Sequence, residues 1–84
     1  MRLLWDQSAW EDYIQWQSVD RNILKRINKL IVATLRDPYA GMGKPEQLRY
    51  GAQGSWSRRI TEEHRLVYLV IQDDLVILQA RYHY

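Results

Sequence analysis

Three strand-like segments between Ser55 and Tyr84 constrain the fold of this chain most strongly. The segments are SWSRRI (55–60), RLVYLVI (65–71) and DLVILQARYHY (74–84), and each is rich in β-branched, aromatic or aliphatic residues. Only the polar stretches TEEH and QDD lie between them or at their boundaries. Connections this short cannot carry a parallel crossover, which needs roughly a dozen residues or more. The sequence therefore predicts an antiparallel meander.

Two helical segments precede the meander. In AWEDYIQWQ, the side chains of Trp10, Tyr13 and Ile14 share one face of a predicted helix. From Asp20 onward apolar residues recur every three or four positions, which is typical of an amphipathic helix of about four turns. This helix is expected to end at Asp37, because the residue before a proline is disfavoured in the helical conformation. The recurring apolar residues are Ile23, Leu24, Ile27, Leu30, Ile31 and Leu35.

The remaining segments complete an α+β arrangement. RLLW (2–5) predicts a short N-terminal strand, and the loop between the helices and the meander holds all four glycines and one further strand candidate, EQLRY (46–50). A chain of 84 residues has room for one hydrophobic core. We therefore expect a single α+β domain over residues 1–84. Its short N-terminal strand and two-helix hairpin should pack on one face of a mostly antiparallel sheet of four to five strands.

The composition excludes several classes of chemistry. There are no cysteines, which removes disulfides, CxxC redox motifs and thiolate zinc sites. His64 and His83 are the only histidines, too few for a histidine-based metal site, so we expect no metal and no cofactor. The net charge of +2 does not by itself indicate a nucleic-acid-binding protein. No apolar run approaches the roughly 20 residues that span a bilayer, and we expect a cytoplasmic protein.

Alternation along the last strand separates two sets of side chains. Val76, Leu78, Ala80 and Tyr82 fall on one face, which should be the helix-covered face. The other face receives Gln79, Arg81 and His83.

The loop before this strand decides what His83 faces. A three-residue QDD loop would bring Arg65 onto its face, whereas a two-residue turn would place Arg65 beside Tyr82 and Tyr84. We favour the three-residue loop, because QDD lacks the Asn-Gly or Asp-Gly pair that tight turns prefer. On the preceding strand either Arg58 or Arg59 joins the Arg65 face, depending on the intervening turn.

This constellation is compatible with RNA cleavage without a metal ion. Arginines suit bidentate contact with phosphate oxygens, and a carboxylate such as Glu46 with a histidine such as His83 supplies a base and an acid. The residues alone do not decide for this chemistry. An arginine-rich sheet face is more often a solvated surface with acidic neighbours, and a terminal histidine is more often simply exposed.

Sequence motifs point to a family. The run GSWSRRITEEHRLVY, the earlier GKPE and the terminal RYHY resemble the signature of YoeB-type toxins, which belong to the RelE/ParE superfamily of toxin–antitoxin modules. The resemblance extends over essentially the whole chain. It implies a RelE/ParE-like fold related to that of microbial ribonucleases. It also implies a toxin that acts as a ribosome-dependent endoribonuclease, cutting mRNA during translation and so inhibiting protein synthesis.

The same resemblance assigns catalytic roles to residues of this sequence. It implies that Glu46 is the general base, that Arg65 stabilises the phosphate in the transition state, and that His83 is the general acid. Tyr84 completes the site at the end of the chain. These four residues are the expected catalytic set.

Further residues are implied to contact RNA phosphates. Arg58 and Arg59 of WSRRI are expected to do so, with Arg59 favoured, and Lys44 and Arg49 flank Glu46 as expected RNA contacts. Arg49 departs from the lysine expected in close relatives, and an Arg-for-Lys change keeps the charge but alters hydrogen-bond geometry.

The resemblance also implies partners. These are a cognate antitoxin of the YefM/Phd type, the ribosome, mRNA, operator DNA bound through the toxin–antitoxin complex, and a second copy of the chain in a homodimer. Two alternatives remain open: a ParE-like toxin that is not a nuclease, and a non-catalytic module that binds nucleic acid or protein. The joint presence of Glu46, Arg65, His83 and Tyr84 disfavours the ParE-like alternative.

Overall fold

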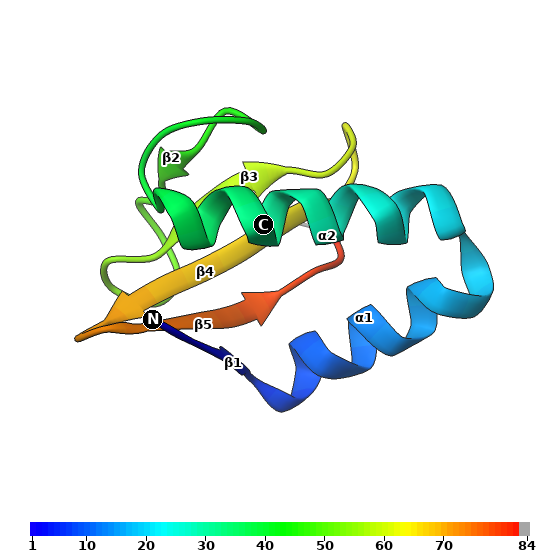
Figure 1. The fold of residues 1–84 in the computed structure, drawn as a ribbon, viewed down its shortest axis with the longest axis horizontal. Coiled ribbons are helices and arrows are strands. Elements are labelled where there is room, and N and C mark those ends of the chain that lie inside the picture. The colour runs from blue at the N-terminus through cyan, green and yellow to red at the C-terminus, as the bar shows by residue number, and fades with distance from the viewer. Residues whose placement is uncertain (83–84) are drawn as a thin grey trace.

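The structure, a computed structural model, describes residues 1–82 of the chain. Within these residues the fold consists of five strands and two helices (Figure 1). Neither helix is long and apolar enough to cross a lipid bilayer. The elements are β1 (Arg2–Trp5), α1 (Gln7–Val19), α2 (Arg21–Arg36), β2 (Glu46–Gln47), β3 (Trp56–Arg59), β4 (Arg65–Ile71) and β5 (Asp74–Gln79).

The strands form one sheet in the order β1-β5-β4-β3-β2. Strands β2 to β5 pair antiparallel, so the predicted meander is confirmed, and β1 joins the edge of β5 in parallel. Both helices pack on the same face of the sheet, with α2 running across β3 and β4 in the view of Figure 1. This is the α+β architecture expected from the sequence.

Aspartates begin both helices. The Asp6 side chain accepts a hydrogen bond from the backbone N–H of Ser8, so Asp6 is the N-cap and α1 begins at Gln7. Asp20 accepts from the N–H groups of Asn22 and Ile23 at the start of α2. Each carboxylate satisfies donors that have no partner within the helix, which fixes where the helix starts.

The core lies between the helices and the sheet. Helix α1 contributes Ala9 and Trp16 to it, rather than the Trp10 and Ile14 that the sequence favoured, and those two side chains are 43% and 45% exposed. Trp10 instead packs edge-on against Trp5, with ring centroids 5.5 Å apart. The buried core cluster comprises Ala9, Trp16, Ile27, Leu30, Ile31, Ile60, Leu66, Tyr68, Leu75, Ile77 and Ala80.

The β4–β5 hairpin differs from the prediction. Its turn has two residues, Gln72 and Asp73, because Ile71 pairs with Asp74; Gln72 adopts a positive φ of 55°. The predicted three-residue loop is therefore wrong. As a consequence Leu75 and Ile77 are the buried residues of β5, not Val76 and Leu78.

An irregularity further along the hairpin reverses the consequence of the short turn. Tyr68 pairs with Ile77, whereas the preceding Val67 pairs with Gln79, so Leu78 is an extra residue on β5. A bulge of this kind shifts the alternation of all later residues by one position. Beyond it, odd-numbered positions of β4 and β5 share a face, and Ala80 is fully buried as expected.

Candidate active site

The candidate site lies on the sheet face opposite the helices. Glu46 pairs with Ser57, which pairs with Val67, and Arg59 pairs with Arg65. Paired residues of neighbouring strands point to the same side of a sheet. These positions alternate with those of the helix-packed residues on β4, and they therefore form a separate face.

Glu46 and Arg65 are in direct contact on this face. Nη1 of Arg65 donates to Oε1 of Glu46 at 3.1 Å and to the hydroxyl of Ser57 at 3.3 Å. The Arg65 side chain is only 18% exposed, whereas that of Glu46 is 60% exposed. Two acceptors and partial burial fix the guanidinium, while the carboxylate remains accessible to a ligand. An ion pair with an exposed member contributes little to stability, so its main effect is to orient the two groups.

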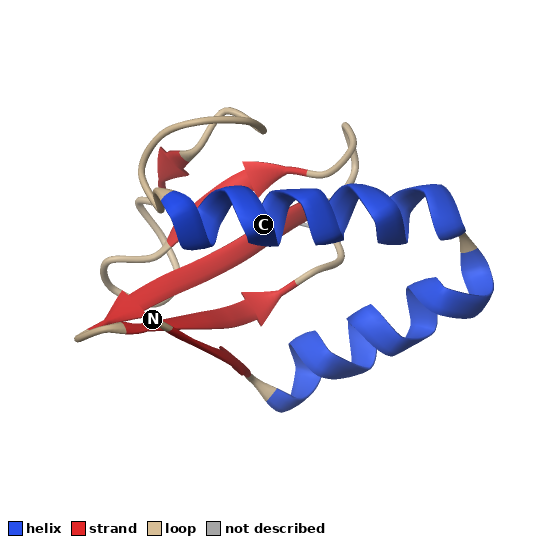
Figure 2. Ribbon diagram, viewed as in Figure 1, coloured by secondary structure: helices blue, strands red, loops and turns tan. Residues whose placement is uncertain are grey.

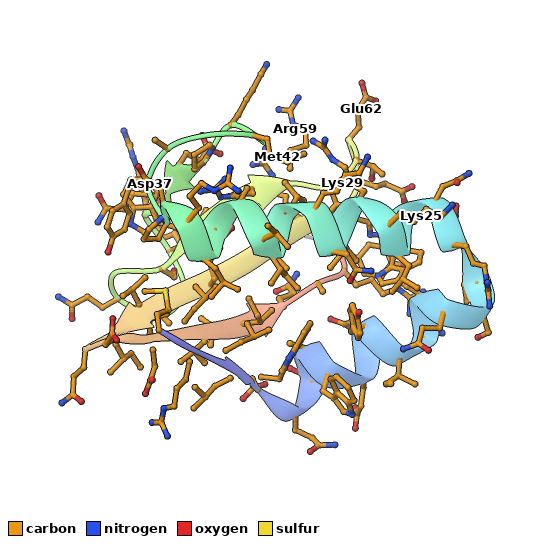
Figure 3. The ribbon with its side chains drawn as sticks, viewed as in Figure 1. Lys25, Lys29, Asp37, Met42, Arg59 and Glu62 are labelled. Carbon is orange, nitrogen blue, oxygen red and sulfur yellow. The ribbon has the colours of Figure 1, made fainter. Side chains whose placement is uncertain are left out.

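Three further cationic residues neighbour this pair in the sequence or in the sheet. Lys44 and Arg49 are exposed and flank Glu46 in the sequence, and Lys44 has a positive φ of 51°. Arg59 is also exposed, and Figure 3 shows it near the upper edge of the molecule, above α2. Its backbone is fixed, because its N–H donates to the Gly43 carbonyl at 2.7 Å and its own carbonyl accepts from Arg26. The Arg59 guanidinium makes no hydrogen bond within residues 1–82, which is compatible with the predicted phosphate contact.

Arg58 does not belong to this surface. It lies on the helix-covered face with no exposed area, and its guanidinium donates to the Tyr68 hydroxyl at 3.2 Å and to the Met42 carbonyl at 2.9 Å. The carbonyls of Asp37 and Ala40 accept from its other terminal nitrogen. The prediction of a phosphate contact from Arg58 is therefore wrong, because all its donor nitrogens are directed into the interior.

Arg58 holds the loop that leads to Glu46. Except for the short β2 arrow, the chain between α2 and β3 is loop, as Figure 2 shows. The Tyr68 hydroxyl adds a further hydrogen bond to this loop by donating to the Pro38 carbonyl at 2.6 Å. Burial raises the pKa of the Tyr68 phenol, an effect that the Arg58 hydrogen bond partly offsets. The loop is thus anchored from inside the protein.

The chain beyond β5 is held against α1. Ala80 donates its N–H to the Asp12 carboxylate at 3.1 Å and accepts from the Trp16 indole N–H at 2.9 Å. Arg81 turns toward the same helix, where its Nη1 donates to the Gln15 side chain and its guanidinium lies 5.8 Å from the Trp16 ring. The expectation that Arg81 faces away from the helices is wrong, because β5 ends at Gln79 and the alternation ends with it.

Tyr82 is the last described residue, and it is held by the segment that begins β4. Its N–H donates to Nδ1 of His64 at 2.8 Å, and its carbonyl accepts from the N–H of Arg65 at 3.0 Å. Its side chain is 51% exposed rather than core-facing as predicted. The predicted acid His83 and the terminal Tyr84 lie outside the described residues.

Two residues of the site were not singled out from the sequence. Ser57 stands two positions before Arg59 on one strand, so alternation could have identified it. His64 lies in the polar TEEH turn, where no local pattern distinguishes it from a solvated residue. Its contact with Tyr82 joins positions far apart in the chain.

Solved structures resemble the whole of this fold. A YoeB/ParE toxin from Agrobacterium tumefaciens superposes with a TM-score of 0.95 at 48% identity, covering 100% of both chains. A YoeB dimer from Staphylococcus aureus gives a TM-score of 0.92 at 39% identity, and a YoeB–YefM complex from the same species gives 0.89 at 38%; each covers 100% of this chain and 98% of the other. The fold is therefore that of the small RelE/ParE-type bacterial toxins.

Sequence comparison narrows this class to one family. The model of the YoeB-like toxin of bacterial type II toxin–antitoxin systems matches residues 5–84. The chain is also 55% identical to the toxin YoeB of Escherichia coli K12 over 84 residues, covering 100% of both sequences. The chain belongs to the family of YoeB-like toxins of type II toxin–antitoxin systems.

Proposed function

We propose that this toxin is a ribosome-dependent endoribonuclease that cleaves translated mRNA and thereby inhibits translation. The observation that carries the proposal is the Glu46–Arg65 contact on the sheet face opposite the helices. It supports the proposal because a carboxylate and a fixed guanidinium stand side by side where a phosphodiester could reach both. The exposed Lys44, Arg49 and Arg59 would hold the RNA backbone nearby.

The reaction begins at a ribose 2′-hydroxyl. A phosphate that binds Arg65 competes with Glu46 for the N–H groups of the guanidinium. When the phosphate displaces Glu46, the carboxylate oxygen becomes available as a base. Glu46 then takes the proton of the 2′-hydroxyl, and that oxygen attacks the adjacent phosphorus. Arg65 stabilises the charge that develops on the phosphoryl oxygens.

The second half of the reaction requires an acid. The bond between phosphorus and the 5′-oxygen breaks, and His83 donates a proton to the departing oxygen. The products are a 2′,3′-cyclic phosphate and a 5′-hydroxyl end. Tyr84 completes the proposed catalytic set. The proposed reaction requires neither a metal ion nor a cofactor, because a side chain is assigned to each proton transfer.

The partners follow from the same family. Two Staphylococcus aureus structures are a YoeB dimer and a YoeB–YefM complex. By likeness to them, we propose that this chain forms a homodimer and is neutralised by an antitoxin of the YefM/Phd type. The complex with the antitoxin would bind operator DNA, mainly through the antitoxin. Action on translating ribosomes places the toxin in the cytoplasm.

Primer extension on an mRNA in a reconstituted translation reaction tests the activity. Cleavage is expected with ribosomes and not without them, at positions in the decoding site. Glu46→Gln and His83→Gln should each lower the cleavage rate about 10²- to 10⁴-fold, as loss of one acid–base partner does. Glu62→Gln is the matched control, because Glu62 is an exposed acid in the turn before His64.

Three outcomes would contradict the proposal. Full cleavage by Glu46→Gln or His83→Gln at equal concentration would remove the assigned roles. Cleavage of an mRNA with a 2′-deoxy nucleotide at the cut position would exclude attack by the 2′-hydroxyl. Gyrase-linked DNA damage without mRNA cleavage after induction would instead identify a ParE-like toxin.

A further inference from the structure

Tyr82 has an unusual backbone conformation. Its φ is +58°, in the left-handed region that residues with a Cβ rarely adopt. This conformation costs about 1–2 kcal/mol for an ordinary L-residue, so surrounding contacts must hold it. Such residues cluster at active sites and other functional positions.

Consecutive residues of the β4 start supply these contacts. His64 accepts the Tyr82 N–H through Nδ1 at 2.8 Å, and the backbone N–H of Arg65 donates to the Tyr82 carbonyl at 3.0 Å. Both polar groups of the Tyr82 backbone are therefore bound by one dipeptide. The same Arg65 contacts Glu46 through its side chain. The dipeptide thus connects the proposed base directly to the residue that precedes His83.

The His64 ring is itself fixed. It is 8% exposed and packs edge-on against Trp16 with ring centroids 4.8 Å apart, while the Tyr82 ring lies 5.0 Å away on a tilted plane. Because Nδ1 accepts a hydrogen bond, the neutral ring carries its proton on Nε2. A buried ring with one defined acceptor is suited to hold a backbone amide in one position.

We propose that His64 is a positioning residue for the chain end, whose Nδ1 holds Tyr82 in the conformation from which His83 and Tyr84 continue. This role rests on the proposed ribonuclease function, in which His83 is the acid. His64 acts only through Tyr82 and is not a catalytic residue. Catalytic geometry is sensitive to small displacements, and a shift of about 1 Å can cost about 10²-fold in rate.

Two substitutions separate the hydrogen bond from the packing. His64→Leu keeps an apolar side chain of moderate size beside Trp16 and removes the acceptor. His64→Asn restores an acceptor, because the amide Oδ1 occupies nearly the same place on the side chain as Nδ1 of histidine. We expect His64→Leu to lower kcat for cleavage on ribosomes about 10²-fold with little change in KM. His64→Asn should recover most of this loss although it packs less well.

Amide hydrogen exchange provides a readout that does not depend on activity. The Tyr82 amide should be protected in the wild type, unprotected in His64→Leu and protected again in His64→Asn. The proposal is overturned if His64→Leu retains the protection of Tyr82 or the wild-type kcat. It is also overturned if His64→Asn restores the protection without the rate.

A measurement on the wild-type protein covers the case in which a variant does not fold. The ¹⁵N chemical shifts of the His64 ring should show Nδ1 as a hydrogen-bonded acceptor and the proton on Nε2. The opposite tautomer would overturn the proposal without any variant. If the wild type fails to cleave mRNA on ribosomes, the proposed function fails, whereas the ring shifts and the Tyr82 exchange still decide whether His64 holds the chain end.

Discussion

Replacement of Arg58 by methionine should destabilise the protein strongly. The change removes a buried guanidinium that donates to the Tyr68 hydroxyl and to three backbone carbonyls. Methionine fills much of the volume but donates nothing, so the carbonyls of Asp37, Ala40 and Met42 lose their partner. Hydrogen bonds to charged groups contribute about 1.5–3 kcal/mol each, but the loop can move and let water reach some of these groups.

We therefore expect a loss of about 3–5 kcal/mol, because each buried carbonyl left without a donor costs about 1–3 kcal/mol and relaxation of the loop recovers part of the sum. A domain of this size has a stability on the order of 4–12 kcal/mol, so the loss is a large fraction of the total. The corresponding fall in Tm is on the order of 15 °C or more. Arg58→Lys should give a smaller loss, because an ammonium group keeps the charge but cannot reach all four acceptors.

Urea unfolding followed by tryptophan fluorescence measures the effect, with far-UV circular dichroism as a second probe of the same transition. The neighbouring Arg59→Met is the matched control: Arg59 is exposed and should change the free energy of unfolding by no more than about 0.5 kcal/mol. Equal stability of Arg58→Met and wild type would refute the structural role of Arg58. Equal losses of stability for Arg58→Met and Arg59→Met would show that the burial of Arg58 does not cause its effect.

Three further predictions concern stability. Burial raises the pKa of Tyr68 in the folded state. The neutral phenol therefore contributes fully to stability below about pH 10, and this contribution is lost as the pH rises through the folded pKa. In urea titrations at alkaline pH, Tyr68→Phe should therefore lose less stability than the wild type. Hydrogen bonds from Arg2 lower the pKa of Asp74. The contribution of this ion pair to stability is therefore present above about pH 4 and is lost as the pH falls through the folded pKa of Asp74. The stability difference between wild type and Arg2→Met should shrink in acid, and a constant difference would contradict the assignment. Gly43→Ala should lower the free energy of unfolding by about 1–3 kcal/mol, because the added Cβ would lie 2.7 Å from a leucine methyl group of α2. Gly54→Ala is the control, since Gly54 has a similar positive φ but its nearest atom would be 3.5 Å away. In thermal unfolding, Gly54→Ala should lose less stability than Gly43→Ala.

Much of the fold could be predicted from local patterns. Periodicity identified both helices and the strands of the meander, and the position before Pro38 correctly ended α2. The predicted α1 face was right for Tyr13, which packs against the core, and wrong for Trp10 and Ile14, which are exposed. Trp10 instead contacts Trp5, which lies outside the helix. Alternation failed similarly on β5, where a two-residue turn and a later bulge each shifted the register by one residue.

The candidate site was predicted in part. Glu46 and Arg65 do come together, although the sequence offered no measure of the distance between β2 and β4. The choice between Arg58 and Arg59 stayed open in the sequence. Alternation puts these two adjacent residues on opposite faces of the sheet, but only the length of the turn before β4 determines which of them shares a face with Arg65. The structure places one in the interior and the other at the surface.

The sequence by itself determined the order of the elements, the absence of thiol chemistry and, through its motifs, the family. These properties depend on local periodicity, composition and residue identity, which a linear chain displays directly. Only the tertiary structure decided that Arg58 is structural and that His64 holds Tyr82. Both roles depend on contacts between positions distant in the sequence, and such contacts form only when burial and hydrogen bonding bring the strands and helices together.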